Sequence, residues 1–343
     1  MGGAVSPGVK LRLLDWLACP GCGAVLAVAS GAVVYGELRE GTLACQGCGS
    51  QYPVERGIPR FLPADLTAEV AATAARFGYE WTRFAEIRPE YEEQFRGWIA
   101  PVEPESFKGR LVLDAGCGKG RHLRLASAFG AREVIGLDLG PAVEVAARNT
   151  ADLDNVHVIQ ADLTRPPLRV GSMEVAYSIG VLHHLREPAA GFRALAALLA
   201  PDGLFVTWTY AREGNGWLLA VIDPARRITR RLPLPLVRSL AWTLTVPLWV
   251  AIRLLYGPAR SRPWLRRLLP YQSYFSDLAS FPFREIHSIV FDQLLAPVAH
   301  YMSRHEVEGC LAAADLVFGD LRWHHNNSWA ASGRRRRRPA CSS

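Results

Sequence analysis

The chain has 343 residues, half of them hydrophobic, and a formal net charge of +7 at pH 7. This length predicts two domains, and the composition excludes a disordered chain because it leaves enough apolar side chains for a sizeable core. The charge is uneven, since residues 212–270 hold eleven Arg against two acids, a local balance of +9, and the rest of the chain therefore carries −2. A basic patch is expected in that segment, and a uniformly basic nucleic-acid-binding chain is excluded.

Two nearly repeated segments, LACPGCG and LACQGCG, mark residues 1–63 as a small β-rich unit. Each holds a Cys-x-x-Cys pair whose tight turn aims both sulfurs at one ion. Four thiolates at about 2.3 Å close a tetrahedral zinc site and leave no position for a substrate. Metal binding supplies roughly 10 to 16 kcal/mol to such a ribbon, more than its small core could provide. The predicted ligands of a structural Zn²⁺ are Cys19, Cys22, Cys45 and Cys48.

Two disulfides, or a ribbon that has lost its metal, are the alternatives for these cysteines. Disulfides need an oxidising compartment. The first residues lack the pattern of a signal peptide, because Asp15 interrupts their only short apolar run. We therefore expect a cytoplasmic chain with reduced thiols.

The remaining sequence divides into four parts. Residues 64–105 are expected to form a helical lead-in. In residues 106–211 the apolar runs LVLDAG, EVIGLDL, VHVIQADL, VAYSIGVL and LFVTWTY alternate with helical stretches. This alternation predicts an α/β fold with a doubly wound, mostly parallel sheet and helices on both faces. Residues 212–300 interrupt it as a helical insertion, and residues 301–338 return with a helix and the last strands of the sheet.

A glycine-rich turn in LVLDAGCGKGRHL joins the first strand to a helix. Gly116, Gly118 and Gly120 allow a sharp turn and the close approach of a ligand, and the helix start offers free N–H groups. The spacing fits neither the G-x-G-x-x-G of nicotinamide sites nor the G-K-[ST] of phosphate loops. Instead, an acid stands before the turn and at the end of each of the next two strands: Asp114, Asp138 and Asp162.

This ordered set, with SIGVLHHL at the fourth strand, resembles the Rossmann-like class I methyltransferases that use S-adenosylmethionine, in particular those of ubiquinone and menaquinone biosynthesis. The resemblance implies that Asp138 accepts the ribose hydroxyls and that Asp114 faces the methionyl end. It also implies that Asp162 accepts from the adenine amino group and that Leu139 and Leu163 enclose the adenine ring. The cysteine unit resembles the small zinc-ribbon activator subunits of tRNA and protein methyltransferases, here fused in cis.

Methyl transfer from a sulfonium requires alignment of donor and acceptor, and a proton acceptor where the acceptor is a hydroxyl or an amine. His184 and His183, at the exit of the fourth strand, are the predicted catalytic residues, with packing as the alternative role. Trp81 and Tyr79 are candidates to close over the cofactor. Further candidates for the acceptor pocket come from the insertion and its return: Tyr271, Tyr274, His287, Asp292, His300 and Tyr301.

The insertion contains SLAWTLTVPLWVAI, fourteen uncharged residues at 239–252. A membrane-spanning helix needs about 20 apolar residues, and Pro247 lies inside this run, so a simple transmembrane helix is not expected. The leading expectation is a cap over the substrate cleft. The alternative is a peripheral membrane contact through 236–270, whose Trp and Arg residues would suit an anionic surface and a lipid-linked acceptor.

The expected function is methyl transfer to a small-molecule, glycan-like or lipid-linked acceptor, with O- or C-methylation favoured. The first alternative is an rRNA or tRNA base methyltransferase whose zinc ribbon binds RNA. A core that is not basic and an apolar insertion argue against nucleic acid. The second alternative is non-enzymatic and takes the zinc ribbon as an adaptor.

Overall fold

The computed structural model describes residues 8–259, 268–296 and 299–337. The five apolar runs form the centre of one sheet, and neighbouring strands among them are parallel. Their side chains are buried on both faces, as parallel strands between helical layers require. The predicted α/β class and mostly parallel sheet are confirmed. In spatial order the strands are β12 (Leu199–Tyr210), β11 (Met173–Ile179), β8 (Leu111–Ala115), β9 (Glu133–Asp138) and β10 (Val156–Ala161).

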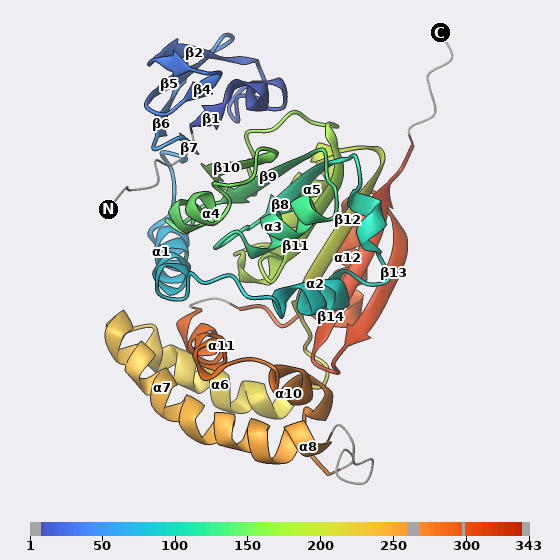
Figure 1. The fold of residues 1–343 in the computed structure, drawn as a ribbon. Helices are drawn as coiled ribbons and strands as arrows, with labels where there is room; N and C mark the ends of the chain where they lie inside the picture. Colours follow the sequence, from blue (N-terminus) through green and yellow to red (C-terminus); the bar gives the residue numbers. More distant parts are fainter. Residues whose placement is uncertain (1–7, 260–267, 297–298, 338–343) are drawn as a thin grey trace.

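Helices cover both faces of this sheet (Figure 1). One hydrophobic cluster joins the sheet to α2 (Tyr91–Ile99), α3 (Arg121–Ala128) and α4 (Val143–Asn149). Another joins it to α5 (Pro188–Leu198) and α12 (Arg304–Ala313). After α12 the chain adds the antiparallel strands β13 (Leu316–His324) and β14 (Ser328–Arg335), and β14 pairs with β12.

The helical insertion lies below the core in Figure 1, at the end opposite the cysteine unit. The lead-in helix α1 (Ala68–Arg83) packs against it through Phe77 and Tyr79. The helices of the insertion are α6 (Gly216–Thr229), α7 (Leu234–Ala251), the short α8 (Gly257–Ala259), α10 (Gln272–Leu278) and α11 (Phe283–Leu295). A π-helical turn, η4 (Ile252–Tyr256), joins α7 to α8.

The long helix of the insertion differs from its expected length. The helix runs without a break from Leu234 to Ala259, a span of 26 residues. Judged by length and composition alone, it could cross a membrane. Pro247 removes one backbone donor on the exposed side of the helix, where water can satisfy the freed carbonyl, so the helix continues. The helix therefore extends beyond the uncharged run at both ends. Residues 260–267 of the predicted membrane-contact segment lie outside the described part of the chain.

The N-terminal unit is joined to the core by its last strand. Strands β2 (Leu26–Ser30), β5 (Gly41–Cys45), β6 (Gln51–Glu55) and β7 (Ile58–Phe61) pair antiparallel in this order. Strand β7 then pairs in parallel with β10, with Arg60 opposite Gln160, so that one sheet of eleven strands runs through both units. The short strands β1 (Val9–Lys10), β4 (Glu37–Leu38) and β3 (Val33–Val34) form a separate sheet of the unit.

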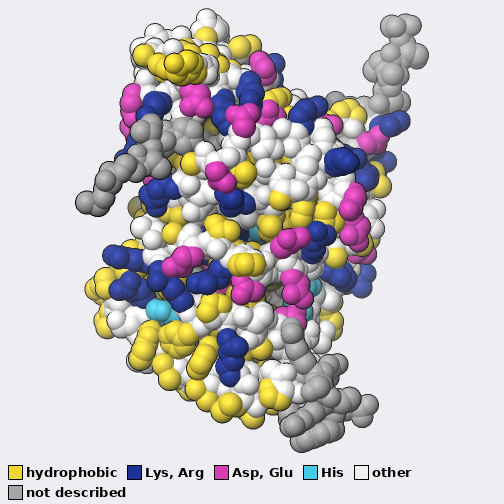
Figure 2. Space-filling view, in the orientation of Figure 1, with side chains coloured by type: hydrophobic (Ala, Val, Ile, Leu, Met, Phe, Trp, Pro, Cys, Tyr) yellow, Lys and Arg dark blue, Asp and Glu magenta, His cyan; other side chains and the backbone are white. Residues whose placement is uncertain are grey.

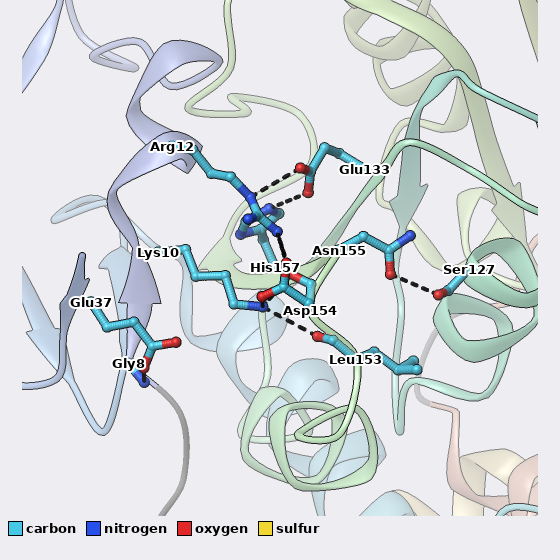
Figure 3. A network of polar contacts seen from close by, with 10 residues as sticks. All are labelled: Gly8, Lys10, Arg12, Glu37, Ser127, Glu133, Leu153, Asp154, Asn155 and His157. Atoms are coloured by element: carbon cyan, nitrogen blue, oxygen red, sulfur yellow. Dashed lines mark hydrogen bonds and ion pairs between the residues drawn. The ribbon is translucent and has the colours of Figure 1, made fainter. Parts of the chain in front are cut away.

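A charged seam also holds the two units together (Figure 3). Arg12 Nε lies 2.9 Å from Glu133 Oε1, and the other oxygen of Glu133 lies 2.8 Å from His157 Nε2. Lys10 Nζ lies 3.2 Å from Asp154 Oδ1. Burial lowers the pKa of His157, which favours the neutral ring in this seam. The unit is therefore fixed to the core by backbone pairing, ion pairs and a shared hydrophobic cluster.

Candidate functional site

A cavity of about 260 Å³ opens where β8, β9, β10 and β11 end. The glycine turn and the strand-end acids line one end of it, and residues of the insertion line the other. Trp81 and Tyr79 were both candidates to close over the cofactor. Trp81 lines the cavity, and Tyr79 does not. The predicted cofactor residues at its wall are Gly116, Gly118, Asp138, Leu139, Asp162 and Leu163.

Asp138 organises the cofactor end of the cavity. Its Oδ2 accepts a hydrogen bond of 2.9 Å from Gly118 N, and its Oδ1 accepts one of 2.8 Å from Gly140 N. Desolvation raises the pKa of Asp138, and the backbone donors act in the opposite direction. One carboxylate thus holds both the glycine turn and the loop after β9, and its remaining lone pairs can accept from a ligand.

Two glycines of the turn are required for close packing. At Gly118, with φ +50°, a Cβ would lie 3.0 Å from Trp81 Nε1, so the turn and the lead-in helix approach closely. Gly120, with φ +82°, does not line the cavity, and a Cβ there would lie 3.0 Å from Ala146 Cα. Gly120 therefore brings α3 against α4 and lies away from the site expected for the ligand.

The two other predicted acids differ in position. Asp114 is 1% exposed and lies beneath the cavity wall beside Tyr177, where burial raises its pKa to about 8. Asp114 was expected to face the methionyl end directly or through a water molecule, and its position behind the wall leaves only the contact through water as a prediction. Asp162 does line the cavity, and its Oδ1 accepts hydrogen bonds from Thr164 N and Oγ1 at 2.8 and 2.7 Å.

At the other end of the cavity, β12 and α11 contribute a polar network. The Tyr210 hydroxyl donates to Asp292 Oδ2 at 2.9 Å, and Gln293 Nε2 donates to the Tyr210 hydroxyl at 2.9 Å. Tyr274 of α10 also lines this end. The network fixes the Asp292 carboxylate at the cavity wall, where it can accept a proton from a bound acceptor.

Glu80 of α1 is fully buried and faces this network. Its Oε1 accepts a hydrogen bond of 2.9 Å from Ser288 Oγ. Burial, followed by the charge of nearby Asp292, raises the pKa of Glu80 well above its usual range, so the protonated form is favoured. Sequence reasoning missed both Glu80 and Tyr210. The available signal was a single acid inside the aromatic stretch GYEWTRF, which is unusual for a solvated helix face.

The two predicted catalytic histidines are separated by the structure. His184 lines the cavity, and its ring centroid lies 4.9 Å from that of Phe77. His183 is 0% exposed and lies behind the wall, with its ring 4.2 Å from that of Tyr210. Burial lowers the pKa of His183 well below its usual range. His183 therefore cannot touch an acceptor in the cavity, whereas the catalytic role of His184 stays a prediction. The candidates Tyr271, His287, His300 and Tyr301 also lie outside the cavity wall.

The four cysteine sulfurs of the N-terminal unit lie within 4.8 Å of one another. The backbone N–H groups of Gly47 and Cys48 point at Cys45 Sγ, with N···S distances of 3.3 and 3.4 Å. Four soft sulfur ligands around one point, with donors that offset thiolate charge, fit a tetrahedral Zn²⁺ ion. None of the four lines the cavity, so this cluster is separate from it.

Arg60 links the N-terminal unit to the cofactor end of the cavity. This residue of β7 is 8% exposed, and its guanidinium donates to Gln160 Oε1 at 2.7 Å. Gln160 Nε2 in turn donates to the carbonyl of Leu139, which lines the cavity, at 2.9 Å. Arg60 also pairs with Glu144 near the start of α4. Arg60 thus acts on the loop between β9 and α4 at two points, through Gln160 at Leu139 and directly at Glu144.

Known proteins share parts of this chain. Residues 113–207 match a family model described as a methyltransferase domain. The ubiquinone biosynthesis O-methyltransferase of Pseudomonas paraeruginosa (strain DSM 24068 / PA7) is 32% identical over 171 residues, which cover 48% of this chain and 72% of that protein. The tRNA U34 carboxymethyltransferase of Pseudoalteromonas translucida (strain TAC 125) is 35% identical over 136 residues, or 38% of this chain and 41% of that protein. The chain spans less than half the length of such relatives.

Solved structures give a more distant likeness. An S-adenosylmethionine-dependent methyltransferase from Mesorhizobium loti has a TM-score of 0.42 and 16% identity, over 71% of this chain and 97% of that one. A complex of the Haloferax volcanii Trm112 methyltransferase activator with a putative methyltransferase has a TM-score of 0.44 and 15% identity, over 77% and 99% of the two chains.

Proposed function

Because this chain belongs to the class I S-adenosylmethionine-dependent methyltransferases, we propose that it methylates an oxygen or carbon atom of a small-molecule, glycan-like or lipid-linked acceptor. The observation that carries this proposal is the single cavity that joins the glycine turn to the Asp292–Tyr210 network. A donor held by the turn and an acceptor held by the insertion would meet inside it.

The residues at the cofactor end fit S-adenosylmethionine. Asp138 offers carboxylate lone pairs to two hydroxyls, and Leu139 and Leu163 offer apolar surfaces to a flat ring. When bound, the cofactor supplies a methyl group already activated by its sulfonium charge. The chain then has to align the acceptor and, for a hydroxyl acceptor, receive its proton at Asp292 or His184.

We further propose that Cys19, Cys22, Cys45 and Cys48 hold a structural Zn²⁺ in a cytoplasmic protein. Reduced cysteines persist in that compartment, and the closed set of four sulfurs leaves no position for a substrate. The metal would brace β5 and β6. Because β7 pairs with β6, the metal would also support Arg60 of β7 and the loop between β9 and α4 that Arg60 holds.

A tRNA or rRNA base is the second candidate acceptor, because several relatives are named tRNA U34 carboxymethyltransferases. Two observations make it the weaker candidate. The matched region covers less than half the length of those proteins, whereas it covers 72% of the ubiquinone biosynthesis O-methyltransferase of Pseudomonas paraeruginosa. The acceptor end of the cavity also holds the Asp292 carboxylate, whose charge would repel a phosphate backbone.

Transfer of radiolabelled methyl into a cell extract tests the proposal. With the wild-type protein we expect label in the lipid or small-molecule fraction and none in RNA. The Asp292→Asn variant should reduce incorporation by about 100-fold, the range of general acid–base catalysis, while its affinity for S-adenosylmethionine stays unchanged. Label in RNA would establish the second candidate, and full activity of Asp292→Asn would remove Asp292 from the chemistry.

Replacing Arg60 should weaken cofactor binding without loss of the metal. Arg60→Met keeps much of the apolar stem but removes the hydrogen bond to Gln160 and the pair with Glu144. A charge-assisted hydrogen bond contributes about 1.5 kcal/mol, so we expect roughly tenfold weaker S-adenosylmethionine binding by calorimetry.

The matched control for this variant is Arg56→Met. Arg56 pairs with the same Glu144, but its side chain is 64% exposed, and we expect less than about a twofold change. Equal affinities of the Arg60 and Arg56 variants would show that the N-terminal unit does not position the cofactor loop.

A further inference from the structure

Helix α7 presents an unusually apolar face to the surface. In the continuous helix Leu234–Ala259, only 22% of the most apolar 18-residue stretch is buried inside the protein, and no acid occurs between residues 234 and 259. In Figure 2 hydrophobic side chains follow this helix along the lower edge of the molecule. Monomeric soluble proteins rarely expose so continuous an apolar surface, which marks a contact site. The side chains of this face that are 40% to 68% exposed include Leu236, Leu240, Trp242, Leu244 and Val250 of α7 and Leu254 of the following turn η4.

A basic hollow adjoins this face. Its volume is about 530 Å³, and it lies between the end of α1, the first turns of α7 and the start of α11. Arg83, Arg238 and Arg284 line it, with Trp242 as a wall shared with the apolar face. In Figure 2 a cluster of Lys and Arg side chains lies beside the hydrophobic side chains of α7.

Two of the three arginines that line the hollow, Arg83 and Arg238, keep a charge that no described acid neutralises. Arg284 pairs with Glu86 at 3.2 Å. Neither Arg83 nor Arg238 has an ion-pair partner among the described residues, and the side chain of Arg83 lies over the Tyr79 ring. His287 adds a further polar edge through a 3.0 Å contact between its Nε2 and the carbonyl of Arg238. Guanidinium groups gathered in this way match a phosphate group, which accepts several of their N–H bonds.

We propose that the α7 face and the arginine hollow together form a docking surface for an anionic phospholipid bilayer. The apolar side chains of α7 enter the boundary between headgroups and acyl chains, and a lipid phosphate occupies the hollow of Arg83, Arg238 and Arg284. An apolar helix face flanked by Arg and Trp is the pattern of helices that lie in the membrane interface. The charge complementarity selects a bilayer over an uncharged apolar partner.

Docking of this kind would place the cavity close to the bilayer. Helix α11 packs on α7 through Phe291 and Leu294 on one side, and its Ser288 and Asp292 line the acceptor end on the other. One helix layer therefore separates the proposed membrane surface from the acceptor. Membrane docking does not depend on methyl transfer, and either proposal can fail without the other.

Vesicle sedimentation of the full chain tests the proposal, with no cofactor or acceptor present. We expect binding to phosphatidylcholine vesicles that contain phosphatidylglycerol, and at least about tenfold weaker binding to phosphatidylcholine alone. Leu240→Glu with Leu244→Glu should weaken binding to both kinds of vesicle. Arg83→Ala with Arg238→Ala should weaken binding to the anionic vesicles alone, by about tenfold or more.

Matched controls use residues of similar exposure elsewhere. Val170→Glu and Arg39→Ala, both exposed and outside the insertion, should bind as the wild type does. Absence of binding to anionic vesicles, or equal binding by the α7 variant, would overturn the proposal. So would a dimer in sedimentation velocity that Leu240→Glu dissolves, because a second copy would then cover this face. Tight binding of inorganic phosphate that leaves vesicle binding unaffected would assign the hollow to a free anion instead.

Discussion

The Asp138→Ala variant is expected to lose measurable affinity for S-adenosylmethionine. The substitution removes the proposed acceptor of the ribose hydroxyls, and it also frees the N–H groups of Gly118 and Gly140 that the carboxylate holds at 2.9 and 2.8 Å. Losing the two hydrogen bonds from the ribose hydroxyls to the charged carboxylate costs about 3 kcal/mol or more. This corresponds to an affinity for S-adenosylmethionine that is at least roughly 100-fold lower. Isothermal titration calorimetry measures the effect directly.

Asp154→Ala provides the control for this prediction. Asp154 is an exposed acid in the seam to the N-terminal unit, and its loss should leave cofactor affinity unchanged. A thermal melt of both variants separates loss of binding from loss of fold. Unchanged affinity in a folded Asp138→Ala protein would refute the cofactor site.

Removal of the metal should destabilise the catalytic core as well as the ribbon. Cys19→Ser is expected to abolish the content of one zinc per chain, and the freed ribbon would then release β7 from β10. Each kcal/mol lost shifts the melting temperature by about 2–4 °C in a domain of this size, so a loss of several kcal/mol lowers it by on the order of 10 °C. Elemental analysis and a thermal melt of the same samples measure both effects.

Cys310→Ser is the matched control, because this half-buried thiol lies on α12 and outside the cluster. It should retain the metal and melt near the wild-type temperature. A Cys19→Ser protein that keeps its metal would remove the zinc assignment. A protein that loses the metal but melts as the wild type does would show that the ribbon does not brace the core.

The central sheet could be predicted because each strand carries its own signal. The runs from LVLDAG to LFVTWTY are apolar on both faces, and this pattern is independent of what lies beside them. The strand IPRF could not be placed in the same way. Its four residues carry no period, and its pairing depends on β10, a hundred positions away in sequence. The continuous sheet, and the position of Arg60 next to the cofactor loop, therefore became visible only in the structure.

The sequence predicted the site residues that lie at strand ends. It did not predict those whose access to the cavity depends on how their side chains are buried. Asp138 and Asp162 reach the cavity because parallel strands end at the same edge. Of the neighbouring histidines, one faces the cavity and one the core, and sequence alone gives no reason to choose between them. Glu80 likewise joins the acceptor end through a tertiary contact between α1 and α11, for which the sequence carries no periodic signal.

A crystal structure of the protein with S-adenosylhomocysteine would show whether the cavity holds the cofactor next to the acceptor end. We expect the ribose hydroxyls to lie within hydrogen-bond distance of Asp138 and the adenine to lie between Leu139 and Leu163. We also expect the sulfur to face the end of the cavity lined by Tyr210 and Asp292. A ligand bound elsewhere, or a sulfur turned away from that end, would contradict this expectation.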